Sequence, residues 1–197
     1  MGQIRIVGGS LGGRRLQAPA TDATRPTSDR VREAIASVLA ARDAIESARV
    51  LDLYAGSGAL GFEMLSRGAQ SALFVERDPK VARLIRDNAG ELGVTAQCEV
   101  LSEDVTRQRG EDAIVARGPF SLLLADPPYR DVQRAVDAIV RMVSRGVLDP
   151  DACLLLEHGT KGAPVLPSEF AVLSSYRYGD TTVVLCRATP PAEGAGS

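Results

Sequence analysis

Short apolar runs recur along the middle of the chain, and helical periodicity follows most of them. The runs span residues 50–54, 71–76, 97–101, 120–125 and 152–157. Apolar runs of this length, with little alternation of polar residues, are typical of parallel strands that are buried on both faces of a sheet. Strands that alternate with helices in this way predict a single α/β domain built on a mostly parallel sheet.

Two segments between or beside these strands have the apolar spacing of amphipathic helices. In the first, Thr27 or Ser28 can act as the N-cap, and apolar residues recur at Val31, Ile35, Val38 and Leu39. The second runs from residue 131 to about residue 145. A further helix is expected after residue 76, because Asp78 precedes Pro79 in the order that is typical of a helix N-terminus.

The two ends of the chain show different patterns. Residues 4–7 and 14–17 are strand candidates that flank a glycine-rich turn, and they predict a β-hairpin that projects from the main domain. Residues 170–177 and 181–187 predict a closing antiparallel pair. The Pro/Gly/Ala-rich tail is expected to be disordered. These patterns divide the chain into a hairpin extension (1–26), a main domain (27–188) and a tail (189–197).

Composition narrows the class of protein. The chain has 197 residues, of which 45% are hydrophobic and 24% charged, as in an ordinary globular domain. No apolar run approaches the roughly 18 residues that a membrane-spanning helix needs, and residues 1–5 lack the apolar segment of a signal peptide. The three cysteines are odd in number and widely spaced, so they indicate reduced thiols in a cytoplasmic protein rather than disulfides or a metal site.

Charge is distributed unevenly along the chain. The net charge of -2 argues against a nucleic-acid partner, but residues 1–32 contain six arginines against two aspartates, a local balance of +4. Arginines on a hairpin suit contacts with phosphates, although a hairpin that is merely solvated by them would show the same pattern. The candidates for RNA contact are Arg5, Arg14, Arg15, Arg25 and Arg30.

A glycine-rich turn follows the first central strand, and acidic residues follow the next two. Residues 55–61 read Ala-Gly-Ser-Gly-Ala-Leu-Gly, and such glycines let the backbone approach a ligand at the N-terminus of a helix. Glu76 ends the second strand, where a carboxylate commonly binds ribose hydroxyls. Asp104 follows the third strand, where it can accept a hydrogen bond from an adenine amino group or cap the next helix.

The stretch Asp126-Pro127-Pro128-Tyr129 follows the apolar run 120–125 directly. Two prolines cannot continue a strand, so the chain must leave the sheet at its carboxyl end, where open α/β sheets bind ligands. A carboxylate, a backbone carbonyl and an aromatic ring then arrive together. They suit an amino group on a flat heterocycle, because the oxygens can accept its hydrogens and the ring can stack on the base.

The glycine turn 52–58 and the tetrapeptide 126–129 together resemble class I S-adenosylmethionine-dependent amino methyltransferases. Residues 5–9, 13–16, 25–27, 29–33 and 178–181 narrow the resemblance to the RsmD family of 16S rRNA guanine-N2 methyltransferases. The resemblance implies a Rossmann-like, seven-stranded, mostly parallel sheet with one antiparallel strand and an N-terminal hairpin. One departure is Ala36, where the family commonly has an aromatic residue.

The resemblance also implies roles for individual residues. Asp126, Pro127, Pro128 and Tyr129 would form the target-base pocket. In the cofactor site, Asp52 and the glycine turn would hold the methionine part, Glu76 the ribose and Asp104 the adenine, with Thr27 near the methionine end. The expected cofactor-binding set is Thr27, Asp52, Ala55, Gly56, Ser57, Gly58, Glu76, Arg77, Asp104 and Val105, with no metal.

The function so implied is methyl transfer from S-adenosyl-L-methionine to the N2 of a guanine in 16S rRNA, within the small ribosomal subunit or its assembly intermediate. The cysteines indicate a cytoplasmic protein, and a monomer is expected because nothing in the sequence demands more. A DNA amino methyltransferase is an alternative, because the tetrapeptide does not identify the base. Two remoter alternatives are an NAD-dependent oxidoreductase, which shares the glycine turn, and a non-catalytic RNA-binding assembly factor. His158, the single histidine, has no Ser or Cys nucleophile motif beside it and is expected to be structural or exposed to solvent.

Overall fold

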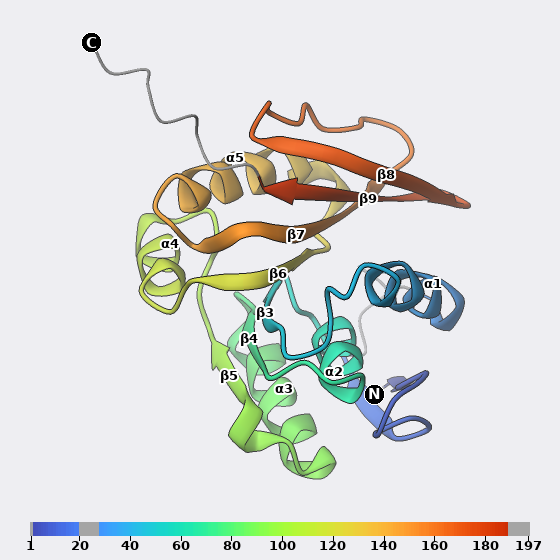
Figure 1. Ribbon diagram of the computed structural model, residues 1–197. Coiled ribbons are helices and arrows are strands. Elements are labelled where there is room, and N and C mark those ends of the chain that lie inside the picture. Colours follow the sequence, from blue (N-terminus) through green and yellow to red (C-terminus); the bar gives the residue numbers. More distant parts are fainter. Residues whose placement is uncertain (1, 20–27, 189–197) are drawn as a thin grey trace.

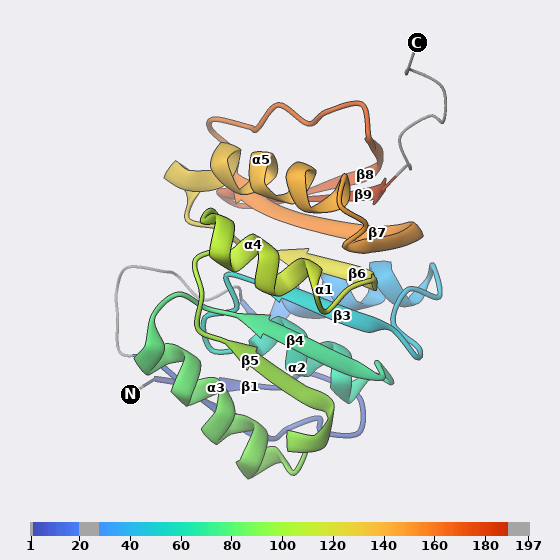
Figure 2. The ribbon, with the colours of Figure 1, turned by 90° about the vertical axis from the view of Figure 1, so that its left-hand side faces the viewer.

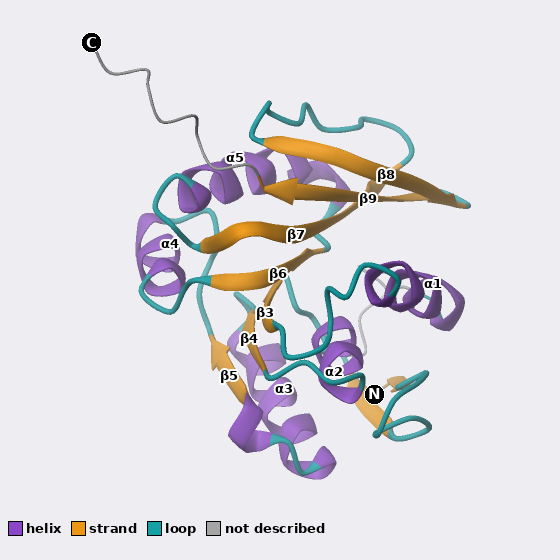
Figure 3. Ribbon diagram, in the orientation of Figure 1, coloured by secondary structure: helices purple, strands orange, loops and turns teal. Residues whose placement is uncertain are grey.

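The computed structural model describes residues 2–19 and 28–188. The predictions made for Arg25, Thr27 and the tail 189–197 lie outside these residues. Strands and helices alternate along the central part of the chain, as the apolar runs predict (Figure 3). The α-helices are α1 (Asp29–Ala40), α2 (Ala59–Ser66), α3 (Pro79–Leu92), α4 (Gln108–Val115) and α5 (Val132–Val143), with short 3-10 turns η1 (Thr95–Gln97) and η2 (Tyr129–Asp131).

A seven-stranded sheet forms the centre of the molecule, in the order β5-β4-β3-β6-β7-β9-β8. All neighbouring strands pair in parallel except at β9, which is antiparallel to both β7 and β8. This confirms the predicted fold, with one antiparallel strand. The strands are β3 (Arg49–Leu53), β4 (Ser71–Val75), β5 (Cys98–Leu101), β6 (Phe120–Ala125), β7 (Leu148–Gly159), β8 (Phe170–Tyr178) and β9 (Thr181–Ala188).

Helices cover both faces of this sheet. In Figure 1, α1 and α2 lie to the right of the central strands, and α4 lies to their left. The view in Figure 2 shows α4 and α5 in front of the sheet. Each face has its own apolar core, because alternate residues of the central strands point to opposite faces. Val50 and Leu122 belong to one core with α1, α2 and α3, whereas Leu51 and Leu123 belong to the other with α4 and α5.

The N-terminal hairpin, β1 (Gly2–Arg5) and β2 (Arg15–Ala18), forms as the sequence predicts, but it packs against the domain rather than projecting from it. Ile6 and Leu16 are buried in the same core as α2 and α3. The carboxylate of Glu63 on α2 accepts hydrogen bonds from the backbone N–H groups of Val7 (2.8 Å) and Gly8 (2.9 Å). The hairpin therefore forms an integral part of this face of the molecule.

Several element boundaries differ from the sequence-based expectations. The first strand ends at Leu53, because Tyr54 adopts a left-handed conformation with φ of 60° and leaves the ladder. Strand β7 begins at Leu148, before Pro150, since an irregularity in the pairing of β6 with β7 allows the proline within the strand. Of the two N-cap candidates for α1, Ser28 is the one observed, and its hydroxyl accepts the N–H of Val31.

The remaining single-residue expectations concern cysteine, histidine and membrane segments. All three cysteines are free, and burial raises the pKa of Cys98 to about 12 and that of Cys186 to about 11. His158 is buried, and its Nδ1 lies 2.7 Å from the carbonyl oxygen of Gly159, which is a structural role. Across residues 2–19 and 28–188, every helix is too short or too polar to cross a membrane.

Candidate functional site

Asp52 lies on the central strand β3, directly beneath the glycine turn. Its side chain is only 2% exposed, and one carboxylate oxygen accepts the backbone N–H of Gly61 at 3.0 Å. Burial raises the pKa of Asp52 to about 7, the hydrogen bond from Gly61 opposes this rise, and the negative charges of Asp126 and Glu76 add to it. A buried carboxyl that titrates near neutrality marks this position as a candidate for function.

The glycine turn between β3 and α2 requires left-handed backbone at two of its glycines. Gly56 has φ of 54° and Gly58 has φ of 79°, which other residues rarely adopt. A Cβ on Gly58 would also lie 2.6 Å from the Phe62 ring, so a larger residue does not fit there. The turn brings its backbone to the carboxyl end of β3, and α2 begins directly after it at Ala59.

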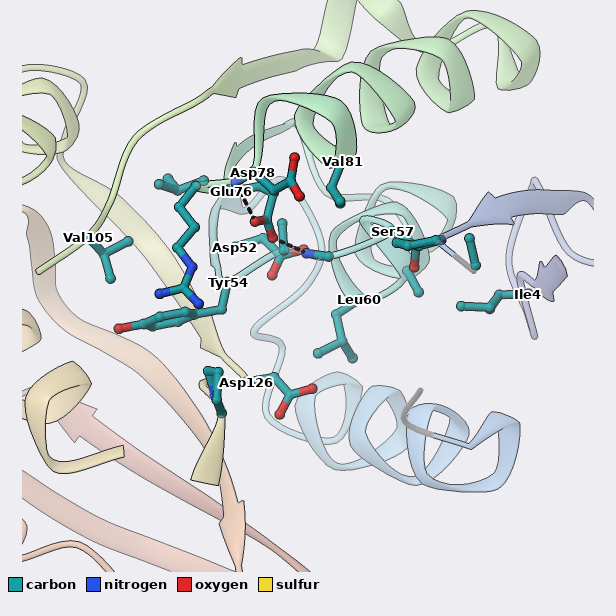
Figure 4. A pocket seen from close by; sticks show the side chains of 18 of the residues that line it. Ile4, Asp52, Tyr54, Ser57, Leu60, Glu76, Asp78, Val81, Val105 and Asp126 are labelled. Carbon is teal, nitrogen blue, oxygen red and sulfur yellow. Dashed lines mark hydrogen bonds between the residues drawn. The ribbon is translucent and has the colours of Figure 1, made fainter. Parts of the chain in front are cut away.

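Glu76, at the end of β4, connects the turn to the start of α3. One carboxylate oxygen accepts the N–H of Gly56 at 3.1 Å, and the other accepts the N–H of Asp78 at 2.9 Å (Figure 4). A carboxylate has about four acceptor positions, so these two bonds leave capacity for hydroxyl groups of a ligand. Asp78 in turn caps α3 by accepting the N–H of Lys80, as predicted.

Asp104 lies in the loop after β5. One of its oxygens accepts both the N–H and the hydroxyl of Thr106, at 2.9 and 2.7 Å. Partial burial tends to raise the pKa of Asp104, but the bonds from Thr106 and the charges of Arg77 and Arg107 outweigh this effect and lower it. Helix α4 begins at Gln108 after a cap residue, Arg107, that makes no side-chain cap bond, so Asp104 shapes the loop rather than capping the helix.

The tetrapeptide Asp126-Pro127-Pro128-Tyr129 leaves the sheet at the end of β6, which is adjacent to β3. The chain turns at once into η2, where the N–H of Asp131 bonds to the carbonyl of Pro128 at 2.7 Å. Tyr129 is half exposed, and its hydroxyl lies 2.8 Å from the Thr181 hydroxyl.

These loops share one cavity of about 350 Å³, a size that suits a small-molecule ligand. In Figure 4 the carboxylates of Glu76 and Asp126 enter it from opposite sides. The sequence-predicted residues that line it are Asp52, Ala55, Gly56, Ser57, Glu76, Arg77, Asp104, Val105, Asp126 and Pro128. Gly58, Pro127 and Tyr129 belong to the same loops but do not line the cavity.

The cavity also contains residues that sequence reasoning missed. Ile4 and Ala18 of the hairpin line it, as does Arg32 of α1, which is 2% exposed and donates to the Arg5 carbonyl and to Asp29. Tyr54 lines it as well. Its hydroxyl oxygen is buried, and no hydrogen-bond partner for it exists among the described residues. The position of Tyr54, two residues after Asp52 and just before the turn, is the signal in the sequence that identifies it.

The four predicted RNA-contacting arginines that the structure describes are all exposed. Arg14 donates to the carbonyl of Glu91, and Arg15 donates to the side chain of Gln3 at 2.9 Å. Arg5 lies 3.5 Å from Asp29. None of these partners buries the guanidinium groups, so the arginines remain accessible to phosphates.

Comparison with known proteins gives a consistent set of relatives. The family model described as "Conserved hypothetical protein 95" matches residues 4–187. The "Putative rRNA methyltransferase YlbH" of Bacillus subtilis is 32% identical over 184 residues, which is 92% of this chain and 97% of the relative. The "Ribosomal RNA small subunit methyltransferase D" of Escherichia coli K12 is 33% identical over 174 residues, 87% of this chain and 83% of the relative. The solved structure of "Putative methyltransferase yhhF from Escherichia coli" superposes with a TM-score of 0.80 at 29% identity, covering 95% of this chain and 99% of that one.

Proposed function

Since this chain belongs to the family described as "Conserved hypothetical protein 95", and the two relatives given above are named as rRNA methyltransferases, we propose that it methylates the exocyclic N2 of a guanine in 16S rRNA. S-adenosyl-L-methionine is the methyl donor. One observation carries the proposal. The glycine turn and Glu76 on one side, and Asp126 and Pro128 on the other, line the same cavity.

The polar groups of the cavity fit this cofactor. The hydrogen-bond donors of S-adenosylmethionine are an α-amino group, two ribose hydroxyls and the adenine amino group, and each of them requires an acceptor. The cavity offers the carboxylates of Asp52, Glu76 and Asp104 in a row along the carboxyl ends of β3, β4 and β5. The turn at Gly56 provides the close backbone approach that a methionine chain requires.

Different residues of the cavity are assigned to the three parts of the cofactor. Asp52, Ala55, Gly56 and Ser57 would hold the methionine part, Glu76 with Arg77 the ribose, and Asp104 with Val105 the adenine. Gly58 would act through the shape of the turn, and Thr27 belongs to this set by sequence. When bound, the cofactor supplies a methyl group on a sulfonium ion, which is activated already and leaves a neutral thioether.

The remaining work of the protein is to position the accepting nitrogen. The lone pair of the guanine amine is delocalised into the ring, so the amine is a poor nucleophile. The carboxylate of Asp126 and the carbonyl of Pro127 each accept one N–H, which directs the lone pair into the cavity. Tyr129 stacks on the base, which must leave its own stack to reach this position. Asp126 can then accept the proton that the methylated nitrogen loses.

The hairpin arginines extend the proposal to the macromolecular substrate. Arg5, Arg14 and Arg15 lie on the hairpin and Arg30 on α1, and both elements contribute residues to the wall of the cavity. Arg25 belongs to the same basic stretch of the sequence. Contacts between these arginines and phosphates would orient the RNA without reading its sequence. We place this activity in the cytoplasm, on the small ribosomal subunit or its assembly intermediate, and assign it to a monomer without a metal.

The deciding experiment measures methyl transfer from labelled S-adenosylmethionine to unmodified 30S particles, free 16S rRNA and duplex DNA, followed by identification of the methylated base. We expect N2-methylguanine in one of the RNA samples. Transfer to adenine or cytosine of DNA alone would replace the proposal with a DNA amino methyltransferase. Binding of the RNA without any transfer would indicate an assembly factor.

A further inference from the structure

The ring of Tyr129 is held by two residues that lie far from it in the sequence. The Tyr129 hydroxyl is 2.8 Å from the hydroxyl of Thr181, the first residue of β9. Gly159, the last residue of β7, lies against the ring itself. Gly159 and Thr181 are directly paired across the antiparallel ladder, so a single cross-strand pair contacts both the ring and its hydroxyl.

Only glycine at position 159 leaves room for the Tyr129 ring in this position. A Cβ at this position would lie 2.8 Å from Cδ2 of Tyr129 and 3.1 Å from both Cγ and Cε2. Real Cβ atoms essentially never approach another atom as closely as 2.8 Å, so alanine here would displace the ring. The need is for space rather than backbone freedom, because Gly159 is in extended strand conformation.

The contacts with Gly159 and Thr181 leave part of the Tyr129 ring exposed, so a base can still stack on it. Tyr129 is 50% exposed although one side of its ring contacts Gly159. An exposed tyrosine in a loop samples several rotamers, and a ligand that stacks on it must fix one of them at a cost in entropy. The hydrogen bond to Thr181 fixes the rotamer before the ligand arrives, which lowers that cost.

We propose that Thr181 and Gly159 are positioning residues that hold the Tyr129 ring in place for a flat, unstacked purine base. The inference rests on the proposed function, because it assigns these residues to the recognition of the acceptor base. It predicts that changes on β7 and β9 act on the nucleic-acid substrate and leave the cofactor site intact, since neither residue lines the cofactor cavity.

The test compares Thr181→Val with Thr182→Val, which makes the same chemical change on the same strand at a residue without a side-chain hydrogen bond within residues 2–19 and 28–188. We expect Thr181→Val to lower kcat/KM for the RNA substrate about fivefold, mainly through KM, the size expected for one lost hydrogen bond. Affinity for S-adenosylhomocysteine, measured by calorimetry, stays within twofold of wild type. Thr182→Val behaves as wild type in both measurements.

Two further variants give the test independent readouts. Tyr129→Phe keeps the ring and removes the hydroxyl, so it should show the same fivefold loss, and the double variant Tyr129→Phe/Thr181→Val should lose no more than either single one. Gly159→Ala displaces the ring and should raise KM for RNA more than Thr181→Val does, again with unchanged cofactor affinity.

The outcomes separate the two proposals. An active wild type in which Thr181→Val and Gly159→Ala both keep a normal KM for RNA overturns the inference, and so do additive losses in the double variant. A loss of cofactor affinity equal to the loss for RNA overturns it too, because the residues would then act through the general fold. A wild-type protein that transfers no methyl group to any RNA is instead a failure of the proposed function.

Discussion

At the scale of single residues, the cavity concentrates carboxyl groups within reach of one another. Asp52, Glu76, Asp104 and Asp126 all line it. Burial, with a smaller contribution from the negative charges of Asp126 and Glu76, raises the pKa of Asp52 to about 7 and keeps it partly protonated near neutral pH. A cation in the cavity would offset those negative charges, and this links the binding of a cationic ligand to the ionisation of Asp52.

The affinity for S-adenosylmethionine should therefore depend on pH. With a pKa of about 7, Asp52 is mostly protonated at pH 6 and mostly ionised at pH 8, and the cationic ligand favours the ionised form. We expect the cofactor to bind about tenfold more weakly at pH 6 than at pH 8. Calorimetry in buffers of different ionisation enthalpy would detect the release of the proton.

The titration of Asp52 also makes the free energy of unfolding depend on pH. The pKa of Asp52 is higher in the folded protein than its ordinary value of 3.8, so the unfolded chain loses this proton first. The contribution of Asp52 to stability therefore falls as pH rises from about 4 to about 7.

Asp52→Asn tests the prediction for cofactor binding, because it should remove most of the pH dependence of the affinity for S-adenosylmethionine. A pH profile that is unchanged in this variant would assign the titration to another group.

Asp126 gives the second prediction at this scale. Asp126→Asn keeps the size of the side chain but replaces one acceptor oxygen with a donor. We expect kcat to fall by about 10²- to 10³-fold, because the accepting amine loses its alignment and charge stabilisation, while cofactor affinity changes less than twofold. Single-turnover methyl transfer and calorimetry measure the two quantities. Asp137→Asn, on the exposed side of α5, is the control, and an equal loss of binding and turnover would contradict the assigned role.

At the scale of elements, helix α2 connects the glycine turn to the N-terminal hairpin. Its N-terminus follows the glycine turn, and its buried Glu63 accepts the N–H groups of Val7 and Gly8 and the Nε–H of Arg67 at 2.8–2.9 Å. On α3, Asn88 bonds to the backbone of Gln17 in the hairpin and to the carbonyl of Ser57 in the turn. Two buried polar side chains thus tie the hairpin to the elements that form the cofactor site.

Glu63→Gln tests this attachment. The substitution keeps the volume, but the amide cannot accept from all three donors, so buried N–H groups lose their partner. We expect the free energy of unfolding to fall by about 3 kcal/mol, which lowers the melting temperature by about 6–12 °C. Thermal denaturation measures this change. Glu91→Gln, an exposed acceptor on α3 that also contacts the hairpin, should cost under about 1 kcal/mol.

The elements of the sheet and the two site loops could be predicted from the sequence because their signals are local. Apolar runs, the turn 55–61 and the prolines at 127 and 128 act through neighbouring residues. The hairpin's place against α2 could not be predicted, because it depends on Glu63, more than fifty residues away. For the same reason, Arg32 and Ile4 appear as cavity residues only once the fold brings them there.

At the scale of the whole molecule, charge is separated more sharply than the net value of -2 suggests. Carboxylates surround the cavity, while the hairpin that forms one of its walls carries exposed arginines. A polyanion would be repelled by the first group and attracted by the second. The balance favours an approach in which phosphates contact the hairpin and only a neutral base enters the cavity.

Charge reversal on the hairpin should therefore weaken RNA binding in a salt-dependent way. Arg14→Glu/Arg15→Glu should reduce the slope of log affinity against log salt by at least about 1 per arginine. Filter binding of 16S rRNA fragments between 50 and 200 mM salt would measure it. Arg145→Glu, at an exposed ion pair on the α4–α5 face, should leave the slope unchanged. An unaltered slope in the hairpin variant would limit the hairpin to a structural role.

The strand order β5-β4-β3-β6-β7-β9-β8 has a consequence for how such a protein can diversify. The chain first builds outward from β3 to β5 and then returns to add β6 and β7 on the other side, where β8 forms the edge and β9 pairs between β7 and β8. Residues proposed to contact the methyl donor come mainly from β3, β4, β5 and the loops that follow them. The residues proposed to act on the base belong to later strands: Asp126 follows β6, Gly159 ends β7 and Thr181 begins β9. Substitutions at Gly159 and Thr181 can alter the choice of base without changing the lining of the cavity, because neither residue lines it, so the two specificities can change independently.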